Sequence, residues 1–194
     1  MEIYEQSIEE YYRKNYPEYK IIKIGNFLFV KMGKLITFHF DEKNNYIPKY
    51  SIGPQWYLTL LLLIIIISLV YLVYSTIFIN LSFIEKLIFF LFVAIEYFLV
   101  FKTALIHNKI AMNKNILIEN KGYCSICKVS FDPKNKVKHC GFCGVCVEQM
   151  DHHCVWVGKC IAKNNLYYFY AMVGNVFILY IYIIICGVLM GIRK

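Results

Sequence analysis

The chain has 194 residues, a formal net charge of +8 and a hydrophobic fraction of 59%. That fraction exceeds the roughly 45–50% of ordinary soluble domains, so a typical soluble composition is excluded and membrane-spanning segments are expected. The excess of lysine over arginine and the abundance of isoleucine, tyrosine and asparagine indicate compositional drift and point to no mechanism.

Residues 1–55 carry mixed charge and many tyrosines. We expect them to form a cytosolic N-terminal tail that lies near the membrane. Residues 3–19 favour a short amphipathic helix, and the apolar runs 27–30 and 35–40 predict a small hairpin. No signal-peptide pattern opens the chain.

Two apolar segments follow this tail. Residues 57–79 contain no charge and exceed the ~20 residues that a helix needs to cross a bilayer. Trp56 and Tyr57 suit the membrane interface, so we place the first transmembrane helix at 56–79. After a tight luminal turn at 80–86, we place the second at 83–101.

The second span contains one acidic residue, Glu96. A carboxylate in mid-membrane costs roughly a few kcal/mol, so Glu96 should face the interior of the helix bundle or be protonated. It is either a polar contact inside the bundle or a structural carboxylate near the interface.

A dense cluster of cysteine and histidine occupies residues 124–160. Seven of the eight cysteines and three of the five histidines lie there. C-x2-C turns are typical of zinc sites, because the two side chains of one tight turn converge on one metal. The stretch offers ten candidate ligands: Cys124, Cys127, His139, Cys140, Cys143, Cys146, His152, His153, Cys154 and Cys160.

Two tetrahedral zinc sites would use eight of these ten ligands, so two side chains would remain for another role. The spacing does not exclude a double zinc ribbon with a purely structural role. A disulfide-rich module is disfavoured, because the topology below puts this stretch in the reducing cytosol.

The distribution of charge sets the orientation. Residues 102–163 hold ten lysines against four acidic residues, and the N-terminal tail holds eight basic residues, whereas the turn at 80–86 has one lysine. Positive charge favours the cytosolic side, so the N-terminus and the cysteine-rich loop are expected there. The uncharged run 164–192 is the third span, in which Cys186 is expected to be inert.

The run H-C-x2-C-x2-C-x4-D-H-H-C-x-W-V-x2-C resembles the cysteine-rich domain of the DHHC-type protein S-acyltransferases, or palmitoyltransferases. The resemblance covers residues 124–169 and implies two interleaved zinc sites. It assigns Cys124, Cys127, His139 and Cys146 to the first, and Cys140, Cys143, His153 and Cys160 to the second.

The same resemblance gives roles to the two side chains left over. Cys154 is implied as the nucleophile, His152 as the general base and Asp151 as the carboxylate that orients it. Such a base can take the thiol proton, because the thiolate is the reactive form of cysteine. Trp156 and Phe169 match positions at the mouth of the family's acyl cavity.

Several positions depart from the family pattern. Lys134-Asn135-Lys136 replaces a P-x-R sequence, although Lys136 and Lys138 can still attract the phosphates of coenzyme A, unless this is only a solvated basic loop. His107-Asn108-Lys109 stands where a D-P-G motif is usual, and His107 is expected at the surface. Val155, Lys159 and Ala162 also differ, at positions that are neither zinc ligands nor catalytic.

The family usually has a fourth span and a T-T-x-E motif, and neither occurs within these 194 residues. Two expectations follow: an incomplete gene product, or a divergent member whose acyl cavity is weakened or completed by a partner.

The fold class expected is an all-α polytopic membrane protein with three transmembrane helices and a small cytosolic domain at 102–163, rich in loops and hairpins, that binds two zinc ions. The expected activity is transfer of a palmitoyl group from acyl-CoA, through Cys154, to cysteines of membrane-proximal proteins. The expected location is the Golgi, the endoplasmic reticulum or the plasma membrane, with no nucleic-acid partner. The alternatives are a catalytically weak or inactive zinc-stabilised membrane scaffold and a zinc-ribbon adaptor for ubiquitin transfer.

Overall fold

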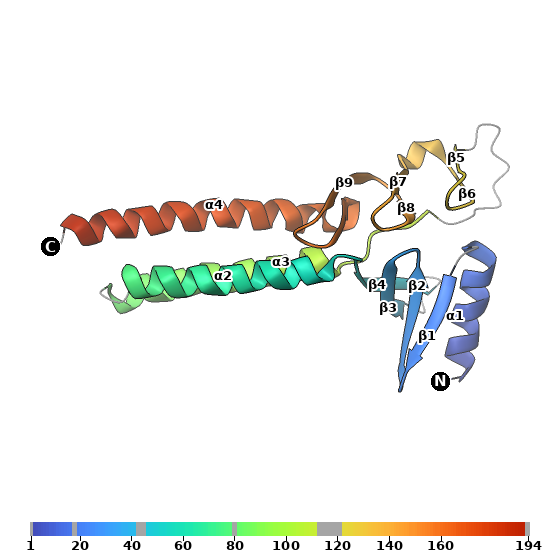
Figure 1. Cartoon of the computed structure of the whole chain (residues 1–194), viewed down its shortest axis with the longest axis horizontal. Coiled ribbons are helices and arrows are strands. Elements are labelled where there is room, and N and C mark those ends of the chain that lie inside the picture. Colours follow the sequence, from blue (N-terminus) through green and yellow to red (C-terminus); the bar gives the residue numbers. More distant parts are fainter. Residues whose placement is uncertain (1, 17–18, 42–45, 79–80, 112–121, 193–194) are drawn as a thin grey trace.

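The computed structural model describes residues 2–16, 19–41, 46–78, 81–111 and 122–192. Its longest elements are the three helices α2 (Trp56–Thr76), α3 (Phe83–Leu105) and α4 (Lys163–Ile192), which run side by side (Figure 1). All three are long and apolar enough to cross a membrane. The three helices predicted from hydropathy are therefore present, and α3 continues four residues beyond the predicted end. The last residue of the predicted first span, 79, and the first residue of the predicted luminal turn, 80, lie outside the described residues.

Local signals explain where α3 begins. Ser82 and Glu85 form a capping box, in which the Ser82 hydroxyl accepts from the Glu85 backbone N–H and the Glu85 carboxylate accepts from the Ser82 backbone N–H. Farther along, Asn175 of α4 donates a 2.9 Å hydrogen bond to Glu96. Glu96 is therefore a polar contact inside the bundle, where α3 packs closely against α4.

The N-terminal region is more structured than a tail. Helix α1 (Glu2–Asn15) precedes a meander of four antiparallel strands, β1 (Tyr19–Ile24), β2 (Phe27–Met32), β3 (Leu35–Asp41) and β4 (Ile47–Ile52). The predicted helix and the predicted hairpin, β2 with β3, are both present. The all-α fold class was incomplete, because it left out this sheet.

The cysteine-rich region consists of three short hairpins and one 3-10 turn. Strands β5 (Gly122–Cys124) and β6 (Val129–Phe131) pair, as do β7 (Lys138–Cys140) with β8 (Val145–Val147) and β9 (Met150–Cys154) with β10 (Lys159–Ala162). The 3-10 helix η3 (Pro133–Asn135) connects the first two hairpins. Strand β10 leads directly into α4, so the last hairpin is continuous with the third long helix.

The N-terminal sheet and the cysteine-rich hairpins share one hydrophobic core. Val30 and Met32 of the sheet are fully buried in the same cluster as Val129 and Val145 of the hairpins. The backbones also meet: Lys34 N–H donates to the Cys143 carbonyl at 2.8 Å. A Cβ on Gly33 would lie 2.8 Å from the Cys143 carbonyl oxygen, which is closer than real Cβ atoms come. Only glycine permits this approach.

A buried lysine holds three parts of the molecule together. Lys159 of β10 is 2% exposed, and its ammonium donates to the Ile106 carbonyl at 2.6 Å and to the Ser51 hydroxyl at 2.9 Å. Burial lowers the pKa of Lys159 to about 7. The contacts link the last hairpin to the end of α3 and to β4.

The expectation that His107 lies at the surface was wrong. Its side chain is 4% exposed, because its backbone is fixed on both sides: its N–H donates to the Lys49 carbonyl and its carbonyl accepts from Asn164. Burial, and then the charge of Lys159, lower the pKa of His107 to about 3. This ring is therefore neutral and lies inside the junction between sheet, helix and hairpins.

Candidate metal centres and reactive cysteine

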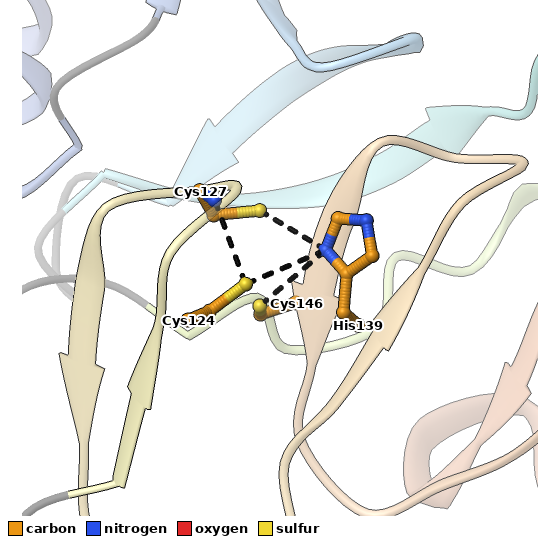
Figure 2. A group of neighbouring side chains, drawn as sticks. All are labelled: Cys124, Cys127, His139 and Cys146. Atoms are coloured by element: carbon orange, nitrogen blue, oxygen red, sulfur yellow. Dashed lines mark hydrogen bonds between the residues drawn. The ribbon is translucent and has the colours of Figure 1, made fainter.

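The first cluster comes from the strands β5, β7 and β8 and from the turn between β5 and β6. Cys124 and Cys127 flank the tight turn after β5, while His139 and Cys146 face each other across the β7–β8 pair. Figure 2 shows the three sulfur atoms gathered around the His139 ring. Nδ1 of that ring lies 3.3 Å from the sulfur of Cys127, 3.7 Å from that of Cys124 and 3.8 Å from that of Cys146.

The second cluster is more deeply buried. Cys140 and Cys143 flank the β7–β8 turn, while His153 and Cys160 lie opposite each other on β9 and β10. Nδ1 of His153 lies 3.4 Å from the sulfur atoms of Cys140 and Cys143 and 3.7 Å from that of Cys160. The ligand sets implied by the resemblance are thus the two sets that the fold brings together.

The spacing of these atoms fits tetrahedral zinc. With Zn–S near 2.3 Å and Zn–N near 2.0–2.1 Å, ligand atoms on a tetrahedron lie about 3.6–3.8 Å apart. The sulfur atoms of Cys143 and Cys160 lie 3.6 Å apart, which is far beyond a disulfide bond. Backbone N–H groups of Cys127 and Cys143 point at the sulfurs of Cys124 and Cys140, as expected where a thiolate must be stabilised.

The protonation of the clusters also favours a bound cation. Contact with Cys140, then burial, raises the pKa of Cys143 to about 12, and burial raises the pKa of Cys146. Three thiols packed this closely cannot all ionise on their own, because each thiolate disfavours the next. A divalent metal removes that penalty, so the donor set fits zinc bound by thiolates.

Gln55 supports the second cluster from a distant part of the sequence. Its side-chain oxygen lies 2.8 Å from Nε2 of His153. An amide oxygen can only accept, so Nε2 carries the proton and Nδ1 is left free to face the three sulfurs. Gln55 directly precedes α2, and it was not predicted from the sequence, because nothing near it in the chain indicates a ligand.

Cys154 belongs to neither cluster in the described part of the chain. Its side chain is 8% exposed and packs with Leu63 of α2, Val157 of the following turn and Met172 of α4. The thiol therefore lies at the apolar junction between the hairpins and the long helices.

The two residues before the second-cluster histidine make a polar pair. Nδ1 of His152 lies 3.2 Å from the Asp151 carboxylate. A carboxylate accepts, so Nδ1 carries the proton and the Nε2 lone pair is available to another group. The ring of Phe169 packs edge-on against His152, with centroids 5.2 Å apart. Asp151 and Phe169 therefore fix the orientation of this imidazole.

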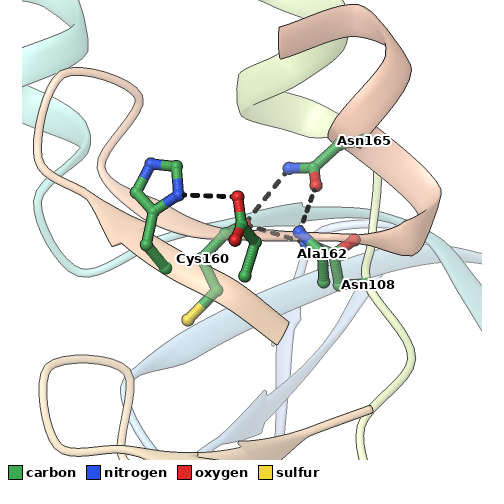
Figure 3. Close-up of polar contacts among 6 residues, drawn as sticks. Asn108, Cys160, Ala162 and Asn165 are labelled. Carbon is green, nitrogen blue, oxygen red and sulfur yellow. Dashed lines mark hydrogen bonds and ion pairs between the residues drawn. The ribbon is translucent and has the colours of Figure 1, made fainter. Parts of the chain in front are cut away.

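Two asparagines fix the strand that bears the last ligand (Figure 3). Asn165 accepts from the Ala162 N–H at 2.9 Å and donates to the Cys160 carbonyl at 3.1 Å. Asn108 donates to the same carbonyl at 2.8 Å. Asn165 also donates to the Thr103 carbonyl, which ties β10 to α3. The role of Asn108 was not predicted from the sequence.

The remaining predicted site residues lie at the surface. Lys136 and Lys138 are exposed on the hairpin side, and Trp156 is 52% exposed in the turn after Cys154. The structure brings Phe169 to His152, but no contact between the described residues joins the two lysines to Cys154. Their predicted contact with coenzyme A stays a prediction.

Comparison with known proteins identifies the same region. Residues 117–193 match the family model for DHHC palmitoyltransferases. The chain is 42% identical over 74 residues to the human palmitoyltransferase ZDHHC9, which is 36% of this chain and 20% of that protein. It is 46% identical over 55 residues to the palmitoyltransferase swf1 of Schizosaccharomyces pombe, which is 28% of this chain and 14% of that protein. The match thus spans a fifth or less of these relatives.

Proposed function

We propose that the chain is a protein S-acyltransferase, which moves a long-chain acyl group from acyl-CoA to cysteines of membrane-proximal proteins, because residues 117–193 match the DHHC palmitoyltransferase family model. One observation carries this proposal: two clusters take eight of the cysteines and histidines, and Cys154 stays outside both, on the same strand β9 as the paired Asp151 and His152. A purely structural zinc ribbon has no need for that pair.

The first step would form the acyl-enzyme. His152 takes the Cys154 thiol proton at Nε2, and the thiolate attacks the thioester carbonyl carbon. The carbon–sulfur bond to coenzyme A breaks, and the proton on His152 passes to the leaving thiolate. Asp151 stabilises the imidazolium that forms in between.

The second step would repeat this exchange with a protein thiol. His152 takes the proton of the incoming cysteine, whose sulfur attacks the acyl-enzyme carbonyl. The bond to Cys154 breaks, and Cys154 regains a proton. No other reactant is needed, because one thioester replaces another.

The clusters would hold two structural zinc ions, one in each set of three cysteines and a histidine. When bound, zinc cross-links strands that are too short to be stable alone, and contributes on the order of 10 kcal/mol to folding. The eight ligands, Gln55 and the two asparagines then hold the β9–β10 hairpin in place, with Cys154 at the end of β9.

The position of Cys154 at the junction with the helices suits a lipid substrate. Burying a sixteen-carbon chain gains on the order of 10 kcal/mol at ~0.8 kcal/mol per methylene. We propose that the acyl chain lies among the helices near Trp156 and Phe169, with the hairpins in the cytosol. Lys136 and Lys138 would attract the coenzyme A phosphates.

The test is labelling of the purified chain with a clickable palmitoyl-CoA. We expect a hydroxylamine-labile label that Cys154→Ala abolishes while zinc content stays near two per chain. Cys186→Ala is the matched control, because Cys186 is a buried cysteine outside both clusters. Wild-type protein that binds zinc and takes no label would instead indicate a scaffold.

A second variant tests the base. His152→Ala should slow labelling by roughly 10²–10⁴-fold, the usual contribution of general acid–base catalysis. The rate is measured in single turnover with zinc content as the fold check. An unchanged rate would exclude His152 from the proposed role.

A further inference from the structure

A cavity of about 640 Å³ lies where the N-terminal sheet meets the beginning of α2 and the end of α3. The sheet contributes Lys31 and Lys34, the helices contribute residues such as Leu60 and Phe101, and the turn after Cys154 contributes Val157. Three parts of the fold therefore enclose one space, which the proposed reaction does not use.

The two ends of this cavity differ in chemistry. Lys31 and Lys34 are exposed, and no acidic residue is among the described residues that line the space. At the other end the walls are apolar side chains of the two helices. The charge is therefore uncompensated on one side, and the complementary ligand is an amphiphile with an anionic head and an alkyl tail.

The position of the cavity selects among such amphiphiles. Its walls include Trp56, the first residue of α2, and Leu105, the last residue of α3. Tryptophan at the end of a membrane helix marks the level of the lipid head groups. The lysines lie on the sheet side of this level, where an anionic head group would be.

The acyl donor of the proposed reaction is a poorer fit. Asp151, His152 and Cys154 do not line the cavity, and only Val157 comes from their hairpin. A thioester held in this space would therefore be separated from Cys154 by Leu63 and Val157, which line the cavity and pack in the same cluster as that thiol.

We propose that this cavity binds an anionic phospholipid of the surrounding bilayer, with its head group at Lys31 and Lys34 and its chains along α2 and α3. The bound lipid would fill the space beneath the turn that follows Cys154, since Val157 packs in the same cluster as that thiol. The site thus joins the bilayer, the sheet and the reactive hairpin.

Tryptophan quenching tests the proposal in the full chain. In a Trp156→Phe background, Trp56 is the remaining tryptophan and lines the cavity. The protein is placed in phosphatidylcholine nanodiscs that contain equal fractions of brominated phosphatidylserine or brominated phosphatidylcholine. We expect phosphatidylserine to be preferred at Trp56 on the order of tenfold, since two lysines face its head group.

Charge variants make the test specific. Lys31→Glu with Lys34→Glu should remove the preference, and Lys31→Gln with Lys34→Gln should reduce it if the charge reversal fails to fold. Lys20→Glu is the matched control, because Lys20 is an exposed lysine of the same sheet outside the cavity. It should keep the preference.

Three results would overturn the proposal: equal quenching by the two lipids, loss of the preference in Lys20→Glu, or relief of quenching by added palmitoyl-CoA. The last would assign the cavity to the acyl donor. Quenching requires no acyl transfer, so this proposal and the proposed function can fail separately.

Discussion

Gln55 shows how a single side chain far from the cysteine-rich stretch can orient a candidate metal ligand, His153. By accepting from Nε2 of His153, it fixes both the tautomer and the ring orientation. Partners of metal-bound histidines typically change metal affinity by about 10–100-fold. Gln55→Ala should therefore weaken the second site by this factor, as measured by zinc competition with a chromogenic chelator.

The first site and an unrelated glutamine provide the controls. Gln6 is exposed on α1, so Gln6→Ala should leave both sites unchanged. Cobalt substitution adds a spectroscopic readout, because the absorption bands of one cobalt should shift in Gln55→Ala and those of the other should not. Equal weakening of both sites would show general destabilisation instead.

His107 predicts a dependence of stability on pH. Its pKa falls from 6.5 to about 3 on folding, so below pH 6.5 the unfolded chain takes up a proton that the buried ring refuses. Stability is therefore lost as the pH falls from 6.5 towards 3, by about 1.4 kcal/mol per unit. Unfolding measured at pH 6.5 and near pH 5 should differ by about 2 kcal/mol from this group.

Comparison of variants isolates that contribution. His107→Gln should flatten this part of the profile, while His39→Gln, at an exposed position, should keep it. If both variants follow the wild-type profile, protonation of His107 does not govern acid stability.

The sequence predicted the ligands and not their supports, for a physical reason. The C-x2-C pairs lie at short turns, so their spacing marked candidate zinc ligands, and the family resemblance assigned them to two sets. Gln55 meets His153 across 98 positions and Lys159 meets Ser51 across 108, so no local pattern indicates either contact. His107 was misjudged because a polar residue after a span is usually solvated, and only the fold encloses it.

The turns of the N-terminal sheet carry a prediction at the level of elements. Gly25 and Gly33 both have positive φ, of 57° and 56°. A Cβ on Gly25 would meet nothing within 4 Å, whereas one on Gly33 would overlap the backbone of Gly144. Substitutions at these two glycines therefore distinguish the cost of backbone strain from the cost of losing the close contact with the second cluster.

Gly25→Ala should cost about 1–2 kcal/mol, the penalty of a left-handed conformation. Gly33→Ala should cost several times more and speed zinc release, because the sheet must move away from the β7–β8 turn. Both are measured by denaturant unfolding and by the rate of zinc transfer to a chelator. Similar effects of the two substitutions would mean that the contact contributes little.

The strands that were missed have weak local signals. Strand β1 has no alternation of buried and exposed residues, and β4 contains Pro48, which argues against a strand. Pro48 pairs with Phe40 at the edge of the sheet, where the missing N–H is tolerated. The central pair β2–β3 was predicted, because its apolar runs flank a glycine turn.

At the scale of the whole molecule, the shared core couples metal binding to the N-terminal sheet. Removing zinc with a strong chelator should unfold the hairpins, and should also expose Val30 and Met32, which pack against Val129 and Val145. Hydrogen exchange should therefore rise in β2 and β3 as well as in β5–β10, while α2–α4 stay protected. A sheet that remains protected would show that it folds independently.

Hydropathy was sufficient to locate the three long helices, because a membrane span needs only length and apolar composition. It could not show that the N-terminal region packs on the hairpins, since that depends on contacts between glycine backbones and between buried valines. The sequence therefore predicted the long helices well, but it did not predict how the N-terminal sheet packs against the hairpins.

The direct passage from β10 into α4 has a mechanical consequence. A helix of 30 residues is about 45 Å long, well beyond the ~30 Å of a bilayer's hydrocarbon core, and a helix that exceeds this thickness is accommodated by tilting, by kinking or by local thickening of the bilayer. Because no residue separates β10 from α4, a tilt of α4 would also reorient the last hairpin. The thickness of the membrane would thus affect the distance between the Cys154 thiol and the lipid.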